Sequence, residues 1–316
     1  MSKRQPTLLI VVPLGWAPLW TGPLASAPVR LNVAVHGRDD YRPQDVDYVL
    51  SFRPPPGLLK TFSNLKAVFS LGAGVDGFLA DPEYPRHVPL VRFVHPQLSI
   101  EMAQYVVMHT LIFHRHQDVF DSAQKEHKWR QMMLPRPTDR TRIGILGFGE
   151  IGQLAGARLR DLGFPVAGWS RSRKQVDGIE SFAGQEEFDA FLARTDILIC
   201  LLPLTPQTRG ILNARTFARL PEGAMVMNVA RGGHLNETDL IAALDSGHLA
   251  GAVLDVFQSE PLPEDSPLWA HPRVRVTPHI AAISDPAVTV DMVLSGIGRA
   301  ERGEPLDNVV DVSRGY

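Results

Sequence analysis

The sequence has one cysteine, no long apolar run and no large excess of positive or negative charge. Its single cysteine, Cys200, can form no internal disulfide, and the surrounding D-I-L-I-C-L-L predicts a buried strand residue rather than a nucleophile. No run approaches the roughly 18 to 20 apolar residues that a membrane-spanning helix needs. Charged residues make up 21% of the chain and the net charge is -2, so the basic footprint of a nucleic-acid-binding protein is missing. We therefore expect no membrane and no nucleic-acid partner, and a reducing compartment.

The N-terminal segment has the outline of a signal peptide, but prolines and glycines interrupt it. Lys3 and Arg4 precede the apolar T-L-L-I-V-V-P-L-G-W, and A-S-A at 25–27 has the small residues of a cleavage site. Pro13 and Gly15 break the apolar stretch. The pattern favours a first strand at 8–12 and a cytoplasmic protein over an exported one.

The chain is predicted to be α/β, with two Rossmann-like domains built on doubly wound parallel sheets. At 316 residues it exceeds one typical domain. Apolar, β-branched runs separated by Pro, Gly and Asp predict early strands at 31–35, 46–52, 65–71 and 88–94. Beyond P-R-P at 135–137, strands alternate with helical segments at 142–146, 166–169, 197–202, 225–229, 252–256 and 274–277.

Two helical segments are predicted to join the domains. Residues 98–134 lack glycine and proline and carry apolar residues at helical spacing, which predicts one long helix. Another helix is predicted from Pro286 towards Arg302, and the tail D-N-V-V-D-V is expected to return to the first domain. We therefore predict a substrate-binding domain at 1–98 and 284–316, and a dinucleotide-binding domain with the interdomain helix at 99–283.

A G-x-G-x-x-G fingerprint directly follows the strand predicted at 142–146. Gly147 would permit the tight turn, Gly149 would let the backbone approach a pyrophosphate, and Gly152 would let helix pack on strand. The N-terminus of the following helix adds amide donors for the phosphate. In this strand-turn-helix context the motif predicts dinucleotide binding.

A basic cluster, W-S-R-S-R-K, ends the next strand. An NAD site would place an acid there for the ribose hydroxyls, but this chain has Ser170. Arg171 can hold a 2'-phosphate through its planar guanidinium, with Ser170 or Ser172 and Lys174 or Arg173 adding donors. The cluster predicts NADP(H), with NAD still possible. A solvated basic loop is the alternative interpretation.

Three successive strands end in candidate catalytic residues. Arg231 follows M-V-M-N-V-A, Glu260 follows A-V-L-D-V-F-Q-S, and His279 follows V-R-V-T-P. Carboxyl ends of parallel strands meet at one edge of a sheet, so we expect the three to lie together. They suit reduction of a 2-oxo acid: a guanidinium for the carboxylate and carbonyl oxygens, a proton donor, and an acid that orients and charges the donor. Individually, each could be a surface or turn residue.

Metal binding is not predicted. His109, His114, His116 and His127 fall in the predicted long helix, but His114 and His116 point to different faces, and no acid or cysteine completes a ligand set. We expect these histidines to lie on a solvated helix.

These stretches resemble the D-isomer-specific 2-hydroxyacid dehydrogenases. The matching segments are G-F-G-E-I-G, L-L-P-L-T-P-Q-T, N-V-A-R-G-G, A-V-L-D-V-F-Q-S-E-P-L and T-P-H-I-A-A, and the resemblance is specific mainly over 142–282. W-S-R-S-R-K, E-S-F-A-G, S-P-L-W and R-G-Y are similar to an NADPH-dependent branch that reduces glyoxylate and hydroxypyruvate.

The resemblance implies roles for individual residues. Arg231 holds the substrate, His279 passes the proton and Glu260 pairs with His279, while the nicotinamide supplies hydride. The segment L-G-A-G-V-D resembles the substrate loop and adds the binding residues Ala73, Gly74 and Val75. The implied cofactor-binding residues are Gly147, Phe148, Gly149, Glu150, Ile151, Gly152, Ser170, Arg171, Ser172, Lys174, Leu202, Pro203, Thr208, Val229, Ala230, Asp255 and Ala281.

The sequence thus predicts a cytoplasmic, homodimeric, NADP-dependent oxidoreductase that converts glyoxylate or hydroxypyruvate to a D-2-hydroxy acid. Two alternatives stay open: an NAD-dependent relative for a bulkier 2-oxo acid, and a dinucleotide-sensing scaffold. Phe52 and Arg53 stand where side chains would shape the substrate end, so substrate size is open. Trp129, on the predicted interdomain helix, is either ordinary core or a contact to a partner subunit.

Overall fold

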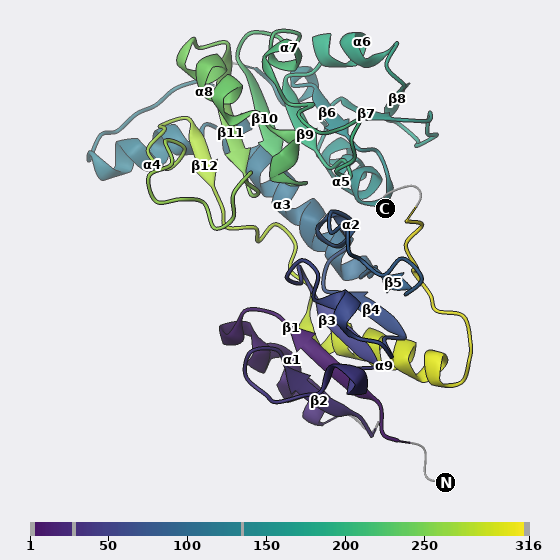
Figure 1. The fold of residues 1–316 in the computed structure, drawn as a ribbon. Helices are drawn as coiled ribbons and strands as arrows, with labels where there is room; N and C mark the ends of the chain where they lie inside the picture. Colours follow the sequence, from purple (N-terminus) through teal and green to yellow (C-terminus); the bar gives the residue numbers. More distant parts are fainter. Residues whose placement is uncertain (1–3, 27–29, 134–135, 313–316) are drawn as a thin grey trace. The chain divides into compact units, whose positions relative to one another are not determined.

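The chain folds into two compact α/β units, each with its own parallel sheet (Figure 1). The computed structural model describes residues 4–26, 30–133 and 136–312. Unit 1 comprises Met1–His95 and Ser284–Tyr316, and unit 2 comprises Pro96–Ile283. The chain therefore leaves unit 1 once, builds unit 2 from a continuous segment, and returns. The predicted α/β class with doubly wound parallel sheets is confirmed.

Unit 1 has a parallel sheet in the order β2-β1-β3-β4-β5 within the described residues. Its strands are Thr7–Val11 (β1), Asn32–Val35 (β2), Tyr48–Ser51 (β3), Ala67–Ser70 (β4) and Leu90–Val91 (β5). Its α-helices are Ala17–Ala25 (α1), Asp76–Leu79 (α2) and Pro286–Glu301 (α9). All five residues of β1 are buried, as expected for an inner strand covered on both faces. The apolar N-terminal segment is thus part of the sheet.

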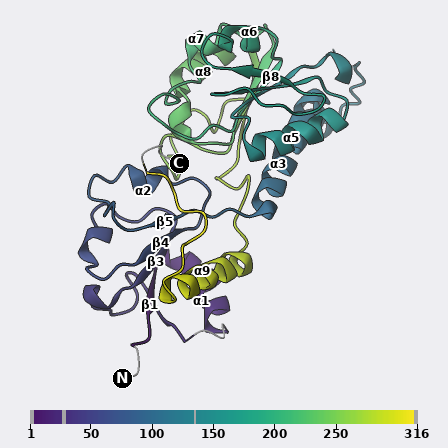
Figure 2. The ribbon, with the colours of Figure 1, turned by 90° about the vertical axis from the view of Figure 1, so that its right-hand side faces the viewer.

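Helices α1 and α9 lie together on one face of this sheet (Figure 2). Val293 and Ile297 of α9 pack in the same cluster as Trp20 of α1 and Phe69 of β4. A Cβ at Gly296 would lie 2.6 Å from the Phe69 ring, so α9 packs closely on β4. The tail after α9 returns to the edge of the sheet, as predicted, through an antiparallel bridge between Val91 and Val309.

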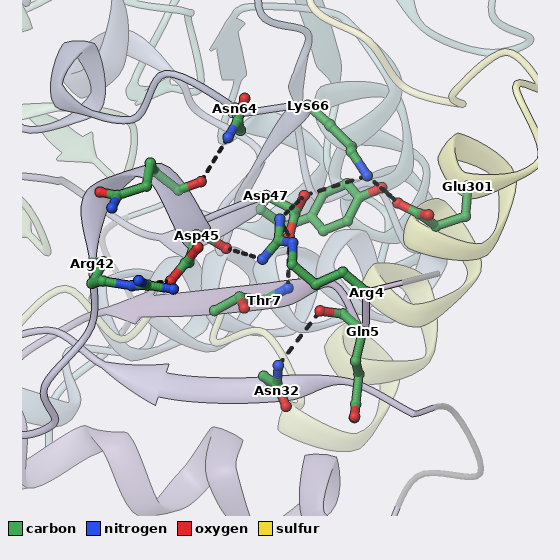
Figure 3. Close-up of polar contacts among 12 residues, drawn as sticks. Arg4, Gln5, Thr7, Asn32, Arg42, Asp45, Asp47, Asn64, Lys66 and Glu301 are labelled. Atoms are coloured by element: carbon green, nitrogen blue, oxygen red, sulfur yellow. Dashed lines mark hydrogen bonds and ion pairs between the residues drawn. The ribbon is translucent and has the colours of Figure 1, made fainter. Parts of the chain in front are cut away.

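A charged cluster holds the amino edge of the unit 1 sheet (Figure 3). The buried Asp47 carboxylate accepts two hydrogen bonds from Arg4 Nη2, at 2.9 and 2.8 Å, and one from the Thr7 amide at 2.9 Å. Lys66 Nζ lies 3.4 Å from Asp47 and 2.6 Å from Glu301, the last residue of α9. The cluster therefore ties the amino ends of β1, β3 and β4 to the returning helix, at the edge opposite the strand ends where ligands usually bind.

Unit 2 has a parallel sheet in the order β12-β11-β10-β9-β6-β7-β8 within the described residues. Its strands are Ile143–Leu146 (β6), Val166–Ser170 (β7), Glu180–Ala183 (β8), Ile197–Cys200 (β9), Ala224–Asn228 (β10), Leu249–Leu254 (β11) and Val274–Val276 (β12). Strand β6 pairs with both β7 and β9, so Leu146 stands opposite Trp169 on one side and Cys200 on the other. The strand order reverses at β6, and such a reversal opens a crevice at the carboxyl edge.

Helices cover both faces of the unit 2 sheet. They are Pro96–His114 (α3), Gln117–Lys125 (α4), Glu150–Asp161 (α5), Phe188–Ala193 (α6), Ala214–Phe217 (α7) and Glu237–Asp245 (α8). Helices α3 and α5 pack side by side on one face (Figures 1 and 2), while α6, α7 and α8 contribute to the core of the other. Cys200 is fully buried in β9, and burial raises the pKa of its thiol to about 12. Within the described ranges, no helix is both long and apolar enough to cross a bilayer.

The single long helix predicted over 98–134 is wrong. Helix α3 ends at His114, and His116 adopts a left-handed conformation with φ 54° before α4 begins. Residues 126–133 lie beyond α4, outside any helix, and Trp129 is 94% exposed rather than core. The expectation of solvated histidines is also wrong for two of the four, since His109 and His114 are buried.

His109 lies in the core of unit 2, and neither of its ring nitrogens has a hydrogen-bond partner among the residues that the structure describes. It is 3% exposed, and its ring lies 4.3 Å from the ring of Tyr105, one turn earlier on α3. Burial, with a smaller contribution from the charge of Arg275, lowers the pKa of His109 to about 4. The imidazole is therefore neutral in the folded protein at physiological pH.

Replacing this histidine, as in His109→Leu, should flatten the loss of stability in acid. The unfolded chain takes up a proton below the ordinary histidine pKa of about 6.5, whereas the folded protein does so only near pH 4, so the wild type loses about 3 kcal/mol as pH falls through this window. Urea unfolding followed by circular dichroism at pH 7, 5.5 and 4.5 measures this. The exposed His87 provides the control: in His87→Leu, the slope of the free energy of unfolding against pH should equal that of the wild type. An unchanged slope in His109→Leu would assign the acid sensitivity to other groups.

Candidate active site

The glycine turn lies at the point where the strand order of unit 2 reverses. Gly147 has φ 95°, and a Cβ there would lie 2.6 Å from the backbone of Leu201, so the turn requires glycine. A Cβ at Gly152 would lie 2.2 Å from the carbonyl oxygen of Gly147, which makes the close packing of α5 on β6 depend on glycine. Gly149 is the N-cap of α5, and among the described residues an added Cβ would meet nothing within 4 Å.

The residues between these glycines divide between core and surface. Phe148 is fully buried, and its ring fills the space beside Gly168, where a Cβ would lie 2.1 Å away. Glu150 and Ile151 begin α5 at its open end. A ligand here would therefore contact backbone amides and the first turn of α5, rather than the Phe148 side chain.

The basic cluster follows β7 directly, and its members have different environments. Ser170 ends the strand and donates a 2.8 Å hydrogen bond to the Ser172 carbonyl. Arg173 forms an ion pair with Glu187 and donates to the Ser181 carbonyl, so neighbouring groups already bind its guanidinium. Arg171 and Ser172 are exposed. The guanidinium of Arg173 therefore has a role within the fold of unit 2.

The loop after β9 begins with Leu202 and Pro203. Thr208 Oγ1 donates to the Pro203 carbonyl at 2.7 Å and accepts from the Thr205 amide at 2.9 Å, which closes the loop on itself. Leu202 is buried, while Pro203 is exposed. This loop stands next to the glycine turn because β9 and β6 are neighbours in the sheet.

The turn after β10 presents Arg231. Val229 and the neighbouring Ala230 are buried, and Asn228 at the strand end donates from Nδ2 to the Arg231 carbonyl at 3.0 Å. Arg231 Nη1 in turn donates to the Ala230 carbonyl at 2.7 Å. A Cβ at Gly232 would lie 1.9 Å from the backbone of Phe257, so the arginine turn packs directly on the loop after β11.

Glu260 and His279 form a hydrogen-bonded pair across the loops after β11 and β12. His279 Nδ1 lies 2.9 Å from Glu260 Oε2, and the other oxygen, Oε1, accepts the Phe257 amide at 3.0 Å. The side chain of His279 is 28% exposed and that of Glu260 is 23% exposed, so the pair is half-buried and can be reached from solvent. A carboxylate on Nδ1 fixes the ring so that Nε2 is the nitrogen left to exchange a proton.

The buried Asp255 carboxylate organises the turn that carries His279. It accepts hydrogen bonds from Thr277 Oγ1 at 2.6 Å, from the Ile280 amide at 2.9 Å and from the Ala281 amide at 2.9 Å. Its carbonyl accepts the His279 amide at 2.8 Å, and His279 itself is left-handed with φ 55°. Asp255 therefore fixes the position of His279 through the hydrogen bonds of this turn.

Tyr105 extends this hydrogen-bond chain into α3. Its hydroxyl lies 2.5 Å from Thr277 Oγ1, and burial raises its pKa to about 12. Tyr105, Thr277 and Asn228 were not among the predicted site residues. The only sequence signal was a polar residue at the end of an apolar strand, M-V-M-N and V-R-V-T, which is too common to be specific.

In unit 1, the loop predicted to bind substrate follows β4. Ser70 Oγ bonds the Gly72 carbonyl at 2.9 Å, and a Cβ on Gly72 would lie 3.1 Å from the Phe52 ring. Ala73 and Gly74 are partly exposed, while Val75 is buried. Arg53 is exposed and lies over Gly77, at the start of α2. These residues gather at the carboxyl edge of the unit 1 sheet.

In unit 2, Arg231, Glu260 and His279 lie at the carboxyl edge of one sheet, on three successive strand ends in space. The glycine turn and the basic cluster occupy the same edge, at β6 and β7. Among the described residues, no group of three or more His, Cys, Asp or Glu side chains could hold a metal ion. The arrangement is typical of a dinucleotide-dependent oxidoreductase of the doubly wound α/β type.

Comparison with known proteins agrees with this class. The model of the D-isomer specific 2-hydroxyacid dehydrogenase NAD binding domain matches residues 107–281. The glyoxylate/hydroxypyruvate reductase A of Yersinia enterocolitica is 44% identical over 302 residues, covering 94% of this chain and 96% of the relative. The chain belongs to the D-isomer-specific 2-hydroxyacid dehydrogenase family.

Solved structures extend the likeness to the whole chain. A D-isomer specific 2-hydroxyacid dehydrogenase from Xanthobacter autotrophicus Py2, in complex with NADPH and MES, is 42% identical with a TM-score of 0.89, covering 99% of this chain and 100% of that one. The NADPH-dependent glyoxylate/hydroxypyruvate reductase of Sinorhizobium meliloti, in complex with NADP and sulfate, is 40% identical with a TM-score of 0.90 and the same coverage. The resemblance seen in the sequence is confirmed.

Proposed function

We propose that this chain uses NADPH to reduce glyoxylate or hydroxypyruvate to the corresponding D-2-hydroxy acid. The observation that carries the proposal is the 2.9 Å pair of His279 and Glu260, which lies at the same sheet edge as Arg231 and the glycine turn. The names of the relatives from Yersinia enterocolitica and Sinorhizobium meliloti support this activity. A dinucleotide-sensing scaffold would need no proton donor paired with a carboxylate.

The residues of unit 2 fit a phosphorylated dinucleotide. Gly149 leaves open space at the N-terminus of α5, where amides and the helix dipole favour a pyrophosphate. Ser170 stands at the end of β7 in place of an acid, and Arg171 follows it, so a 2'-phosphate would meet a cation and hydroxyls. The loop at Leu202 and Pro203 would cover the adenosine side. When bound, NADPH supplies the hydride.

Each catalytic residue then has one task. Arg231 binds the substrate carboxylate and carbonyl oxygen through its planar fork and stabilises the charge that develops on that oxygen. His279 donates the proton from Nε2 while Glu260 accepts from Nδ1. The loop at Gly74 and Val75 in unit 1 has backbone amides suited to a carboxylate, and the family resemblance implies that this loop binds substrate. Unit 1 is accordingly the substrate-binding domain and unit 2 the dinucleotide-binding domain.

Assay of the purified protein with a panel of 2-oxo acids and both cofactors tests the proposal. We expect NADPH oxidation with glyoxylate and hydroxypyruvate, a D-configured product from hydroxypyruvate, and weak turnover with NADH. Higher kcat/KM for a bulky 2-oxo acid with NADH would favour the NAD-dependent alternative. Tight NADPH binding without turnover of any 2-oxo acid would favour the sensing scaffold.

The Arg171→Ala variant should lose preference for NADPH. One charge-assisted hydrogen bond contributes about 1.5–3 kcal/mol, so kcat/KM for NADPH should fall by roughly 10- to 150-fold while the value for NADH stays unchanged. Arg173→Ala is the matched control, because Glu187 and Ser181 bind that guanidinium, and its cofactor preference should stay within a few-fold of wild type. Equal losses with both cofactors in Arg171→Ala would rule out a 2'-phosphate contact.

We also propose that the protein is a cytoplasmic homodimer. The large exposed apolar side chains beyond α4, Trp129 at 94% and Met133 at 90%, support a contact to a second subunit there. Light scattering of the purified protein tests the dimer, and a monomeric mass would contradict it.

A further inference from the structure

His234 is a fully buried histidine whose ring lies between two carbonyl oxygens from different loops. It ends the short helical turn Gly232–His234, directly after Arg231. Its Nδ1 lies 3.1 Å from the Arg231 carbonyl oxygen, and its Nε2 lies 3.3 Å from the Pro203 carbonyl oxygen. The first contact is local, whereas the second joins segments that are distant in the sequence.

The two carbonyls belong to the two loops to which the proposed function assigns ligands. Pro203 follows β9, in the loop that Thr208 closes by donating to the same carbonyl. The Arg231 carbonyl also accepts from Asn228 Nδ2 at 3.0 Å and from the His234 amide at 3.1 Å. The Arg231 turn therefore keeps backbone and amide support of its own. The backbone also joins the turn to this loop, since the Gly210 amide donates to the Gly233 carbonyl at 2.9 Å and the Leu212 amide to the His234 carbonyl at 2.9 Å. The imidazole reaches the Pro203 carbonyl, at the end of the loop nearer β9.

We propose that His234 is a positioning residue that couples the cofactor loop after β9 to the substrate-binding turn at Arg231. The imidazole fills a buried space and can donate to Pro203, so the loop and the turn hold their positions together. A ligand that orders the loop thereby also orders the Arg231 guanidinium, and the site binds an anion more tightly when the dinucleotide is present. The inference rests on the proposed function, because it assumes ligands at both loops.

Binding measurements separate this role from packing. Oxalate serves as the probe, because it carries the carboxylate of a 2-oxo acid and does not react. Calorimetry gives its Kd with and without NADP, and the ratio of the two values is the coupling factor. In His234→Phe, which keeps a ring but has no donor, we expect the factor to fall by about 5-fold or more, within the usual range of coupling between sites.

Two further variants locate the contact that matters. The amide nitrogen of Gln reaches the place of Nε2, while that of Asn reaches the place of Nδ1. Because the backbone already donates to the Arg231 carbonyl, His234→Gln should retain most of the coupling, and His234→Asn should lose it as His234→Phe does. If His234→Phe does not fold, the Asn and Gln pair makes the same comparison.

His248 is the matched control, since its Nε2 also contacts a carbonyl, that of Phe217 at 2.8 Å, next to the amino end of β11. His248→Phe should leave the coupling factor unchanged even if its melting temperature falls. A wild-type coupling factor in His234→Phe, or equal loss in the Gln and Phe variants, would overturn the proposal. Failure of the wild-type protein to bind NADP would instead refute the proposed function.

Discussion

The His279→Asn variant should reduce kcat with glyoxylate by about 100- to 10,000-fold while NADPH still binds, because general acid catalysis typically contributes that factor. Asparagine is the apt replacement for two reasons. It tolerates the left-handed backbone at φ 55° better than alanine does, and its amide can still donate to Glu260. The change therefore removes Nε2 and its proton but leaves the turn in place. Stopped-flow and steady-state assays with NADPH, with cofactor affinity from fluorescence titration, measure the effect.

A second histidine in the same unit controls for this substitution. His271 Nε2 lies 3.4 Å from the Asp245 carboxylate and precedes β12, whereas His279 follows it. Both are histidine–carboxylate pairs, but they stand at opposite edges of the sheet. His271→Asn should keep wild-type kcat. Turnover by His279→Asn within a few-fold of wild type would mean that another group, or water, delivers the proton.

Removal of the guanidinium in Arg231→Ala should lower kcat/KM by about 100- to 10,000-fold, since two charge-assisted hydrogen bonds of about 1.5–3 kcal/mol each are lost. Arg231→Lys should recover only part of this, because an ammonium keeps the charge but not the planar fork. Oxalate affinity should fall from the wild type to Arg231→Lys and further to Arg231→Ala. Guanidine added to Arg231→Ala should restore some turnover. Parallel measurement of kcat/KM and oxalate Kd in the three proteins tests this.

Arg273→Ala provides the comparison for this site. Its Nη1 donates to the Leu244 carbonyl at 2.7 Å, as Arg231 Nη1 donates to Ala230, but it precedes β12 at the amino edge. Loss of this side chain should affect stability and leave kcat/KM near wild type. If Arg231→Lys matched the wild-type protein, a point charge would suffice and the bidentate contact would be wrong.

The strands were predictable because both faces of each parallel sheet are covered. Buried strands such as 8–12 and 197–202 appear as continuous apolar runs, and their ends then place the candidate residues at one edge. The strand Glu180–Ala183 escaped prediction because it is a partly exposed edge strand without such a run. The pattern of apolar residues along the sequence therefore predicts buried strands well and edge strands poorly.

Helix ends and through-space contacts were harder to predict. The break after His114 depends on one left-handed residue, His116, in a stretch without glycine or proline, where the apolar spacing alone suggests continuity. The burial of His109 was visible in principle, since it stands one turn from Tyr105 on the apolar face. The links of Asp255 to Thr277 and of His234 to Pro203 depend on strand register and loop shape, which no single segment contains.

The return of α9 to unit 1 has a consequence for the order in which the chain folds during synthesis. Phe69 and its neighbours on β4 are synthesised before unit 2, but α9, which packs on them at Gly296 and bonds Lys66 through Glu301, is synthesised after it. Unit 2 is continuous and can complete its core while only α1 covers this face of unit 1. Of the two units, unit 1 thus begins first and closes last, and its partly covered sheet is the surface that chaperones would meet on the nascent chain.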